Sequence, residues 1–344
     1  MAATRGVAAH DASSALAQIR STRLAKAAEV SDDAATVQIA TMTFVAFVDD
    51  PSHREWVLER AERVIEKHPA RFIVLDSTDA VDGFNVSLIS RHVGNVAIVN
   101  ERVDVGVRSR DHAAIVSLVQ ELSVPDVPLV LWWSGARLLR SRTFSGIAAL
   151  AQRVLVDSSG QARDEETIRE LGEFANRFPN ASLQDLAFMR LLPWQDIIAQ
   201  FFDDDALRED LFSIDSLRIE SGSDAEALYL AGWLASRLSW EPAGRDAFRD
   251  RRGNDVVFEM IEKGDQRRVH SVLLTARRSR YRAALCDDDD RVVCLTIDGP
   301  KAKPMWHVPL HSIDNISLIE RAILEKPSGQ IFETSLLAVR DVLR

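Results

Sequence analysis

The sequence predicts an α/β protein in which an N-terminal, mostly parallel sheet covered by helices is followed by a second α+β domain with an antiparallel sheet. The chain of 344 residues is long enough for two cores, and its 46% hydrophobic and 27% charged residues are typical of a globular protein. Strand-like and helix-like stretches alternate up to about residue 180, whereas short strand-like stretches follow one another after residue 255. We therefore predict an N-terminal segment at 1–34 and domains at 35–180 and 181–344.

The N-terminal segment is rich in alanine, serine and arginine and poor in acids, a composition that transit peptides share. Residues 15–28 also fit a plain amphipathic helix, and the acids Asp11 and Glu29 weaken the targeting interpretation. We favour a helix that is either docked on the first domain or frayed.

The first domain begins with a strand followed by a helix. Residues 35–48 are apolar and β-branched, which favours a strand. Asp50, Pro51 and the Ser52–Glu55 box then start a helix that runs to about Lys67 and ends at His68-Pro69. The same criteria predict strands at 71–76, 84–89, 95–107, 128–133 and 153–157, and helices at 111–122, 143–151 and 164–178.

The strand at 128–133 ends in a tandem tryptophan, Trp132-Trp133. Pro125 and Pro128 argue against a helix, and the continuous apolar run is typical of a strand buried on both faces. Because neighbouring side chains on a strand point to opposite faces, the two indoles cannot fill the same core. Two interpretations stay open: both indoles pack helix layers, or one of them meets a partner or ligand.

The second domain is predicted to combine helices with an antiparallel sheet. Residues 183–202 read as helical with an interruption at Pro193, and residues 223–240 form a second apolar helix in which Gly232 admits a close neighbour. Core packing is the favoured role of the face that Leu230, Trp233, Leu234 and Leu238 share. Strands are predicted at 256–262, 269–276, 281–285, 292–297 and 305–308, and closing helices at 316–325 and 328–344.

Charge and hydropathy restrict the classes of partner. A net charge of −10 argues against nucleic acid or an anionic membrane as the main partner, because both favour basic surfaces. No apolar stretch approaches the roughly 18 residues that a membrane-spanning helix needs. We expect a cytoplasmic protein that binds neither nucleic acid nor membrane.

The motifs of common catalytic sites are absent from the sequence. No two of the fifteen glycines lie two apart, which excludes a G-x-G dinucleotide fingerprint, and neither a phosphate loop nor a G-x-S-x-G nucleophile elbow occurs. The eight histidines form no H-E-x-x-H motif and no zinc-like spacing with the cysteines. We expect no catalytic residues, no cofactor and no metal, although an enzyme with dispersed catalytic residues would escape this search.

The two cysteines, Cys286 and Cys294, flank an acidic turn at 287–290 and predict a hairpin. Within a hairpin the sulfurs could come within bonding reach, which makes them a candidate redox pair. Two separate reduced thiols are the favoured interpretation, because strand register cannot be read this finely from sequence and the four carboxylates should raise the thiol pKa values.

Four short clusters occur in order over about residues 35–240. The first is His68-Pro69-Ala70-Arg71 with the apolar strand after it. The other three clusters are the strand motif with Pro125, Asp126, Pro128, Trp132 and Trp133, the segment with Asp185, Leu186, Arg190 and Trp194, and residues 230–237.

Together these clusters resemble the glucose-6-phosphate dehydrogenase assembly protein family, OpcA. Phe188 stands where the family has a tryptophan and Gln195 where it has an arginine, and nothing after Asp255 aligns.

The resemblance implies a non-catalytic protein that binds glucose-6-phosphate dehydrogenase and promotes its active oligomer in the oxidative pentose phosphate pathway. Tryptophans and arginines usually dominate such interfaces. For the segment at 185–194, a buried ion pair against a ring competes with a contact surface. The residues that we expect to contact the partner are Asp126, Trp132, Trp133, Asp185, Arg190 and Trp194.

The alternative is an enzyme or sensor that binds a sugar phosphate at the strand ends of the α/β domain. Its candidate ligand-binding residues are Arg71, Asp126, Asp157, Ser158 and Arg190. A third interpretation is a redox-gated form of the assembly factor, in which the two cysteines are the switch.

Overall fold

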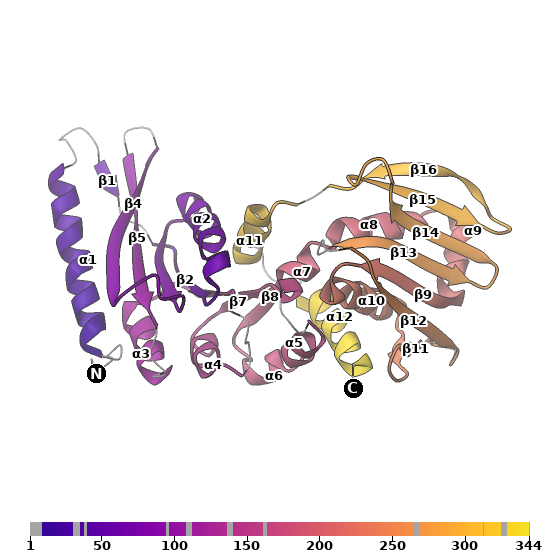
Figure 1. Ribbon diagram of the computed structural model, residues 1–344, viewed down its shortest axis with the longest axis horizontal. Coiled ribbons are helices and arrows are strands. Elements are labelled where there is room, and N and C mark those ends of the chain that lie inside the picture. Colours follow the sequence, from indigo (N-terminus) through magenta and orange to yellow (C-terminus); the bar gives the residue numbers. More distant parts are fainter. Residues whose placement is uncertain are drawn as a thin grey trace. The chain divides into compact units, whose positions relative to one another are not determined.

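The computed structural model describes residues 9–29, 35–37, 40–93, 96–107, 112–135, 140–160, 164–264, 268–311, 313–324 and 329–343. The chain divides into two compact units (Figure 1). Unit 1 comprises Met1–Val156, Phe174–Leu183 and Asn315–Leu324, and unit 2 comprises Asp157–Glu173, Gln184–Asp314 and Glu325–Arg344. Each unit is built from three segments that are not consecutive in the sequence, so a single boundary near residue 180 does not describe the division. Separate domains at 35–180 and 181–344 remain a prediction.

Unit 1 is built on a mostly parallel sheet, which confirms the predicted fold class for the N-terminal half (Figure 1). Neighbouring strands are parallel along the strand order from β1 to β7, whereas β4 (Phe84–Val93), which lies off this order, is antiparallel to β5. Strands β2 and β6 are buried along their whole length, as expected of strands covered on both faces. The strand order is β1 (Ala35–Val37), β5 (Val96–Gly106), β3 (Ala70–Asp76), β2 (Met42–Val48), β6 (Leu129–Trp133), β7 (Arg153–Val156) and β8 (Ser182–Asp185).

The helices of unit 1 come from three distant parts of the chain. Helix α2 (Pro51–Lys67) starts at the predicted proline, but its cap is Asp50, whose carboxylate accepts the Ser52 N–H at 2.8 Å. Helix α1 (Ala9–Glu29) packs on β4 and α3, and α11 packs on α2 and β7. The remaining bounds are α3 (His112–Leu122), α4 (Arg142–Ala148), α6 (Phe174–Arg177) and α11 (Asn315–Leu324).

Unit 2 contains an eight-stranded mixed sheet. An antiparallel sheet was expected, but β9 and β12 run parallel, while the other neighbouring pairs are antiparallel. The strand order is β10 (Glu241–Pro242), β11 (Ala247–Arg249), β12 (Asp255–Glu262), β9 (Ile214–Ser221), β13 (Val269–Ala276), β14 (Ser279–Leu285), β15 (Val292–Asp298) and β16 (Lys303–Pro309).

One face of this sheet packs against helices (Figure 1). Phe201, at the end of α8, contacts the rings of Tyr281 and Trp306. On the opposite face side chains such as Arg218 and Arg282 are exposed. The helices of unit 2 are η1 (Ser158–Gly160), α5 (Asp164–Leu171), α7 (Leu186–Met189), α8 (Leu192–Gln200), α9 (Asp205–Arg208), η2 (Glu209–Ser213), α10 (Asp224–Leu238) and α12 (Gly329–Val342).

Several predicted elements are corrected by the structure. The strand predicted at 35–48 is two strands, β1 and β2, which pair with different neighbours. Residues 182–185 form β8 rather than the start of a helix, and the helix predicted at 164–178 is interrupted at Gly172. Strands β9, β10 and β11 were not predicted. No helix in the described ranges is long and apolar enough to cross a membrane.

Candidate functional site

The tandem tryptophan lies in the core of unit 1. Trp132 and Trp133 are only 1% and 2% exposed, which supports the interpretation in which both indoles pack helix layers. Trp132 contacts Trp56 of α2, whereas Trp133 stacks on Phe47 at 3.8 Å and meets Phe144 of α4 edge-on. The two rings thus serve opposite helix layers, as the strand geometry requires. A partner-binding role for the two indoles remains a prediction. Because both rings are buried, such a role would be indirect.

The residues proposed for a sugar-phosphate site do not all come together. Arg71 lies at the amino end of β3, where it donates to Glu101 at 2.6 Å and to the Leu122 carbonyl at 2.7 Å. Asp126 lies in the exposed turn before β6, at the amino end of that strand, with a φ of 62°. Asp157, by contrast, directly follows the carboxyl end of β7. Because the Arg71 guanidinium already pairs with Glu101, we assign Arg71 a structural role.

Asp157, Ser158, Asp185 and Arg190, which were predicted separately, do converge in unit 2. We call them, with Ser159, Glu226 and Tyr229, the Arg190 cluster. The Arg190 guanidinium donates to both carboxylate oxygens of Asp157, at 3.0 and 2.8 Å, and its Nε donates to Glu226 at 2.9 Å. Its Nη2 also donates to the Ser159 hydroxyl. The predicted buried ion pair exists, but its partners are Asp157 and Glu226 rather than Asp185.

Asp185 organises the other half of the cluster. Its Oδ1 caps α7 by accepting the Ala187 N–H at 2.9 Å and also accepts the Ser158 N–H at 3.1 Å. Its Oδ2 accepts the hydroxyl proton of Tyr229 at 2.7 Å. Because Asp185 and Tyr229 are 1% and 0% exposed, these bonds satisfy polar groups that have no access to water.

Burial shifts the titration of the cluster. Burial, and then the negative charge of Asp157, raises the pKa of Asp185 to about 6. Burial also raises the pKa of Glu226 to about 7, against the attraction of Arg190. Burial opposes the ionised form of Asp157 as well, but the Arg190 charge prevails and lowers its pKa. Two of the three carboxyl groups thus change charge near neutral pH.

A pocket of about 290 Å³ adjoins the Arg190 cluster within unit 2. Trp194 reaches this pocket although the residue is only 4% exposed. The Nε of Arg268, another lining residue, is buried and makes no hydrogen bond to any described group. The lining includes Arg190, Trp194, Glu226, Arg268, Arg291 and His311.

Ser159, Glu226 and Tyr229 are the members of the cluster that were not predicted from the sequence. Glu226 precedes Leu230 by four residues and Trp233 by seven, so helical periodicity already placed a carboxylate on the apolar face of α10. A charged residue at such a position requires a partner. That signal could have identified Glu226, whereas nothing local identifies Arg190 as the partner.

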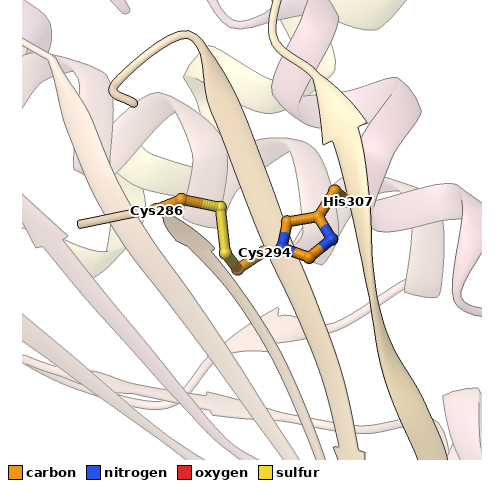
Figure 2. Close-up of side chains that lie close together, drawn as sticks. All are labelled: Cys286, Cys294 and His307. Atoms are coloured by element: carbon orange, nitrogen blue, oxygen red, sulfur yellow. A yellow bond between two sulfur atoms is a disulfide. The ribbon is translucent and has the colours of Figure 1, made fainter. Parts of the chain in front are cut away.

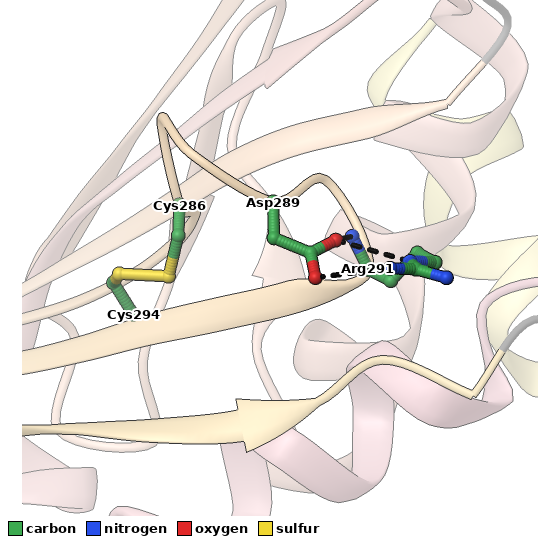
Figure 3. The surroundings of a disulfide bond; sticks show 4 residues. All are labelled: Cys286, Asp289, Arg291 and Cys294. Atoms are coloured by element: carbon green, nitrogen blue, oxygen red, sulfur yellow. Dashed lines mark hydrogen bonds and ion pairs between the residues drawn. A yellow bond between two sulfur atoms is a disulfide. The ribbon is translucent and has the colours of Figure 1, made fainter.

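The two cysteines are joined by a disulfide, with a Cα–Cα distance of 5.4 Å (Figure 3). The predicted hairpin is confirmed as β14 and β15, and Asp289 pairs with Arg291 at 3.1 Å in the turn. The expectation of two separate thiols is wrong here, because Cys286 and Cys294 lie diagonally on one face of the hairpin. His307 lies beside them on β16 (Figure 2), and one ligand atom from each of the three residues lies within 4.8 Å of the others.

Comparison with solved structures gives a remote match. KijD10, a 3-ketoreductase from Actinomadura kijaniata, aligns over 87% of this chain and 96% of its own with 12% identity and a TM-score of 0.48. This similarity is too distant to indicate an activity.

Curated relatives and family models are more informative. Relatives with the provisional name OxPP cycle protein OpcA are 31% identical over 190 residues in Synechocystis sp. and 28% identical over 222 residues in Nostoc punctiforme. Those alignments cover 53% and 62% of this chain but only 40% and 47% of the relatives, so the chain spans less than half of their length. Models of the glucose-6-phosphate dehydrogenase subunit N-terminal and C-terminal domains match residues 61–173 and 181–336. Since the two matches follow in order over most of the sequence, the chain belongs to the glucose-6-phosphate dehydrogenase assembly (OpcA) family.

Proposed function

We propose that this chain is a non-catalytic assembly factor that binds glucose-6-phosphate dehydrogenase in the cytoplasm and promotes its active oligomer. The observation that carries the proposal is the match of both family domains, in order, to residues 61–173 and 181–336. An assembly factor acts by binding the active oligomer more tightly than the inactive form, and its effect cannot exceed that difference in affinity.

The Arg190 cluster is consistent with a structural role in such a factor. Its guanidinium is shared between Asp157 and Glu226, and both oxygens of Asp185 accept hydrogen bonds from within the cluster. These contacts occupy the groups that would otherwise transfer protons. We infer that the cluster holds together α7, α10 and the segment after β7 rather than performing a reaction.

The direct test measures NADPH formation by the cognate glucose-6-phosphate dehydrogenase at increasing concentrations of the purified chain. We expect no activity from the chain alone, a saturable increase in the dehydrogenase rate, and a larger active oligomer in sedimentation velocity. A rate and a sedimentation profile that do not change over a wide concentration range would refute the proposal.

Asp126 offers a sharper test of the binding face, because it is the predicted partner-binding residue in an exposed turn. Asp126→Asn removes the charge, and asparagine tolerates the left-handed backbone at this position. We expect the concentration for half-maximal activation to rise at least about fivefold, equivalent to about 1 kcal/mol. The matched control is Asp79→Asn, since Asp79 is exposed, has a φ of 68° and follows the carboxyl end of β3. Equal activation by both variants would exclude Asp126 from the interface.

Binding of a small anion is the second candidate function, and the pocket with the unpaired Nε of Arg268 favours it. Arginine binds phosphate groups through charge-assisted hydrogen bonds. Thermal unfolding with glucose 6-phosphate, inorganic phosphate or glucose would separate the contributions of phosphate and sugar. We expect stabilisation by the phosphates to be lost in Arg268→Ala and kept in Arg249→Ala, which removes an exposed arginine. No shift with either phosphate would eliminate this candidate.

A further inference from the structure

We propose that Cys286, Cys294 and His307, once the disulfide is reduced, bind one zinc ion on the exposed face of the unit 2 sheet. Sequence spacing did not indicate this site, because the cysteines are eight positions apart and the histidine lies on the next strand. The strand register brings them together: Cys294 lies opposite both Ala284 on β14 and His307 on β16. Cys286 is two residues beyond Ala284, so its side chain points to the same face.

The distances suit a metal site that forms by side-chain rotation. The sulfur and ring nitrogen atoms lie within 4.8 Å of one another (Figure 2). In a tetrahedral zinc site, with bonds of about 2.3 Å to sulfur and 2.0–2.1 Å to nitrogen, ligand atoms lie roughly 3.5–3.8 Å apart. The imidazole therefore needs to approach by at most about 1 Å, and the bond between the two sulfurs must be broken. Because His307 is exposed, its ring has room to move.

The donor set favours a soft or borderline cation. Thiolates together with imidazole select zinc over magnesium or calcium, which prefer oxygen ligands. Three protein ligands leave a fourth position for water on this open face. The acidic turn adds negative charge near the site. Asp289 and Asp290 pair with Arg291 and Arg268, but Asp287 and Asp288 are exposed beside Cys286 and would attract a cation.

Disulfide and zinc compete for the same sulfurs. A dithiol reductant gives two electrons and two protons to the Cys286–Cys294 bond and leaves as its own disulfide. Zinc then replaces the two thiol protons, which are released to water, while the neutral imidazole binds through one ring nitrogen. The reduced chain thus holds a metal that the oxidised chain cannot hold.

The test uses the full chain with Co²⁺ as a spectroscopic probe, followed by competition with Zn²⁺. After reduction with a phosphine we expect one Co²⁺ per chain, with sulfur-to-cobalt charge-transfer absorption and the visible bands of tetrahedral cobalt. The oxidised chain should show neither signal. Displacement of Co²⁺ by Zn²⁺ should protect both thiols from alkylation, as followed by mass spectrometry.

Variants assign the ligands. Cys294→Ser should weaken the charge-transfer band, because only the Cys286 sulfur remains. His307→Ala should weaken Zn²⁺ affinity at least about tenfold, since mutation of a residue that only supports a metal ligand already costs that much. His311→Ala is the matched control, because His311 is an exposed histidine of the same unit outside the cluster. A reduced chain that binds no Co²⁺, or a His307→Ala variant with parental affinity, would overturn the proposal.

Discussion

Glu226 is a carboxylic acid at 3% exposure, and the change of its charge near neutral pH has a consequence for stability. Its pKa is about 7 in the folded chain against an ordinary 4.5, so the folded state binds the proton more tightly. Stability from this group is therefore greatest below about pH 4.5 and is lost as pH rises to 7, with a change on the order of 3 kcal/mol. Glu226→Gln mimics the protonated acid, since its amide oxygen can still accept the Arg190 Nε proton.

We expect Glu226→Gln to unfold like the parent near pH 4.5 and to be more stable than the parent above pH 7. Chemical denaturation at a series of pH values measures this difference. Glu262→Gln, at an exposed position, is the control and should follow the parent. An unchanged pH dependence in Glu226→Gln would mean that the pKa of Glu226 does not differ between the folded and the unfolded chain.

The two tryptophans are expected to behave alike at the residue scale, because each fills the gap to one helix layer. Trp132→Ala and Trp133→Ala should each lower the free energy of unfolding by about 3–5 kcal/mol. Equilibrium denaturation measures the loss. If a variant keeps parental stability but no longer activates the dehydrogenase, the indole that it lacks contacts the partner directly.

Helices α10 and α12 depend on one glycine at the element scale. A Cβ at Gly232 would lie 2.3 Å from the backbone oxygen of Ser335 and 2.4 Å from a methyl group of Val339. Gly232→Ala should therefore force the helices apart and cost about 1–3 kcal/mol, although alanine itself favours a helix. Thermal unfolding checks this, with the exposed Arg237→Ala as control. A more stable Gly232→Ala chain would show that α12 can shift without loss.

The helices and strands also show which structural features can be predicted from the sequence. Gly232 was expected to admit a close neighbour and does so, and the β14–β15 hairpin follows from its acidic turn. Local patterns identify such features because their cause lies within a few residues. The parallel pairing of β9 with β12 and the approach of His307 to Cys294 depend on register between strands, which no local pattern encodes.

The same limit explains the site. Asp157 was predicted as a ligand-binding residue, and Asp185 and Arg190 were predicted as either a buried ion pair or a contact surface, but not as members of one buried network. The tandem tryptophans predicted opposite faces correctly, yet whether each face is covered depends on how α2 and α4 pack on the sheet. The residue types of the site could thus be predicted from the sequence, whereas the exposure of these side chains depends on tertiary packing.

At the scale of the whole molecule, each unit is built from segments that are not consecutive in the sequence. We therefore predict that a single cleavage of the chain does not give two stably folded fragments. A fragment of residues 1–183 lacks α11, whose Leu318 and Ile319 are fully buried and which binds α2 through the Lys67–Glu320 pair at 2.7 Å. Removing α11 exposes apolar surface on α2 and β7, so the fragment should bind a hydrophobic dye and unfold at a lower temperature than a fragment carrying residues 315–324 after a flexible linker. Calorimetry and dye fluorescence compare the two fragments. If both unfold at the same temperature and neither binds dye, unit 1 is complete without α11, and a division of the chain near residue 180 describes its folding after all.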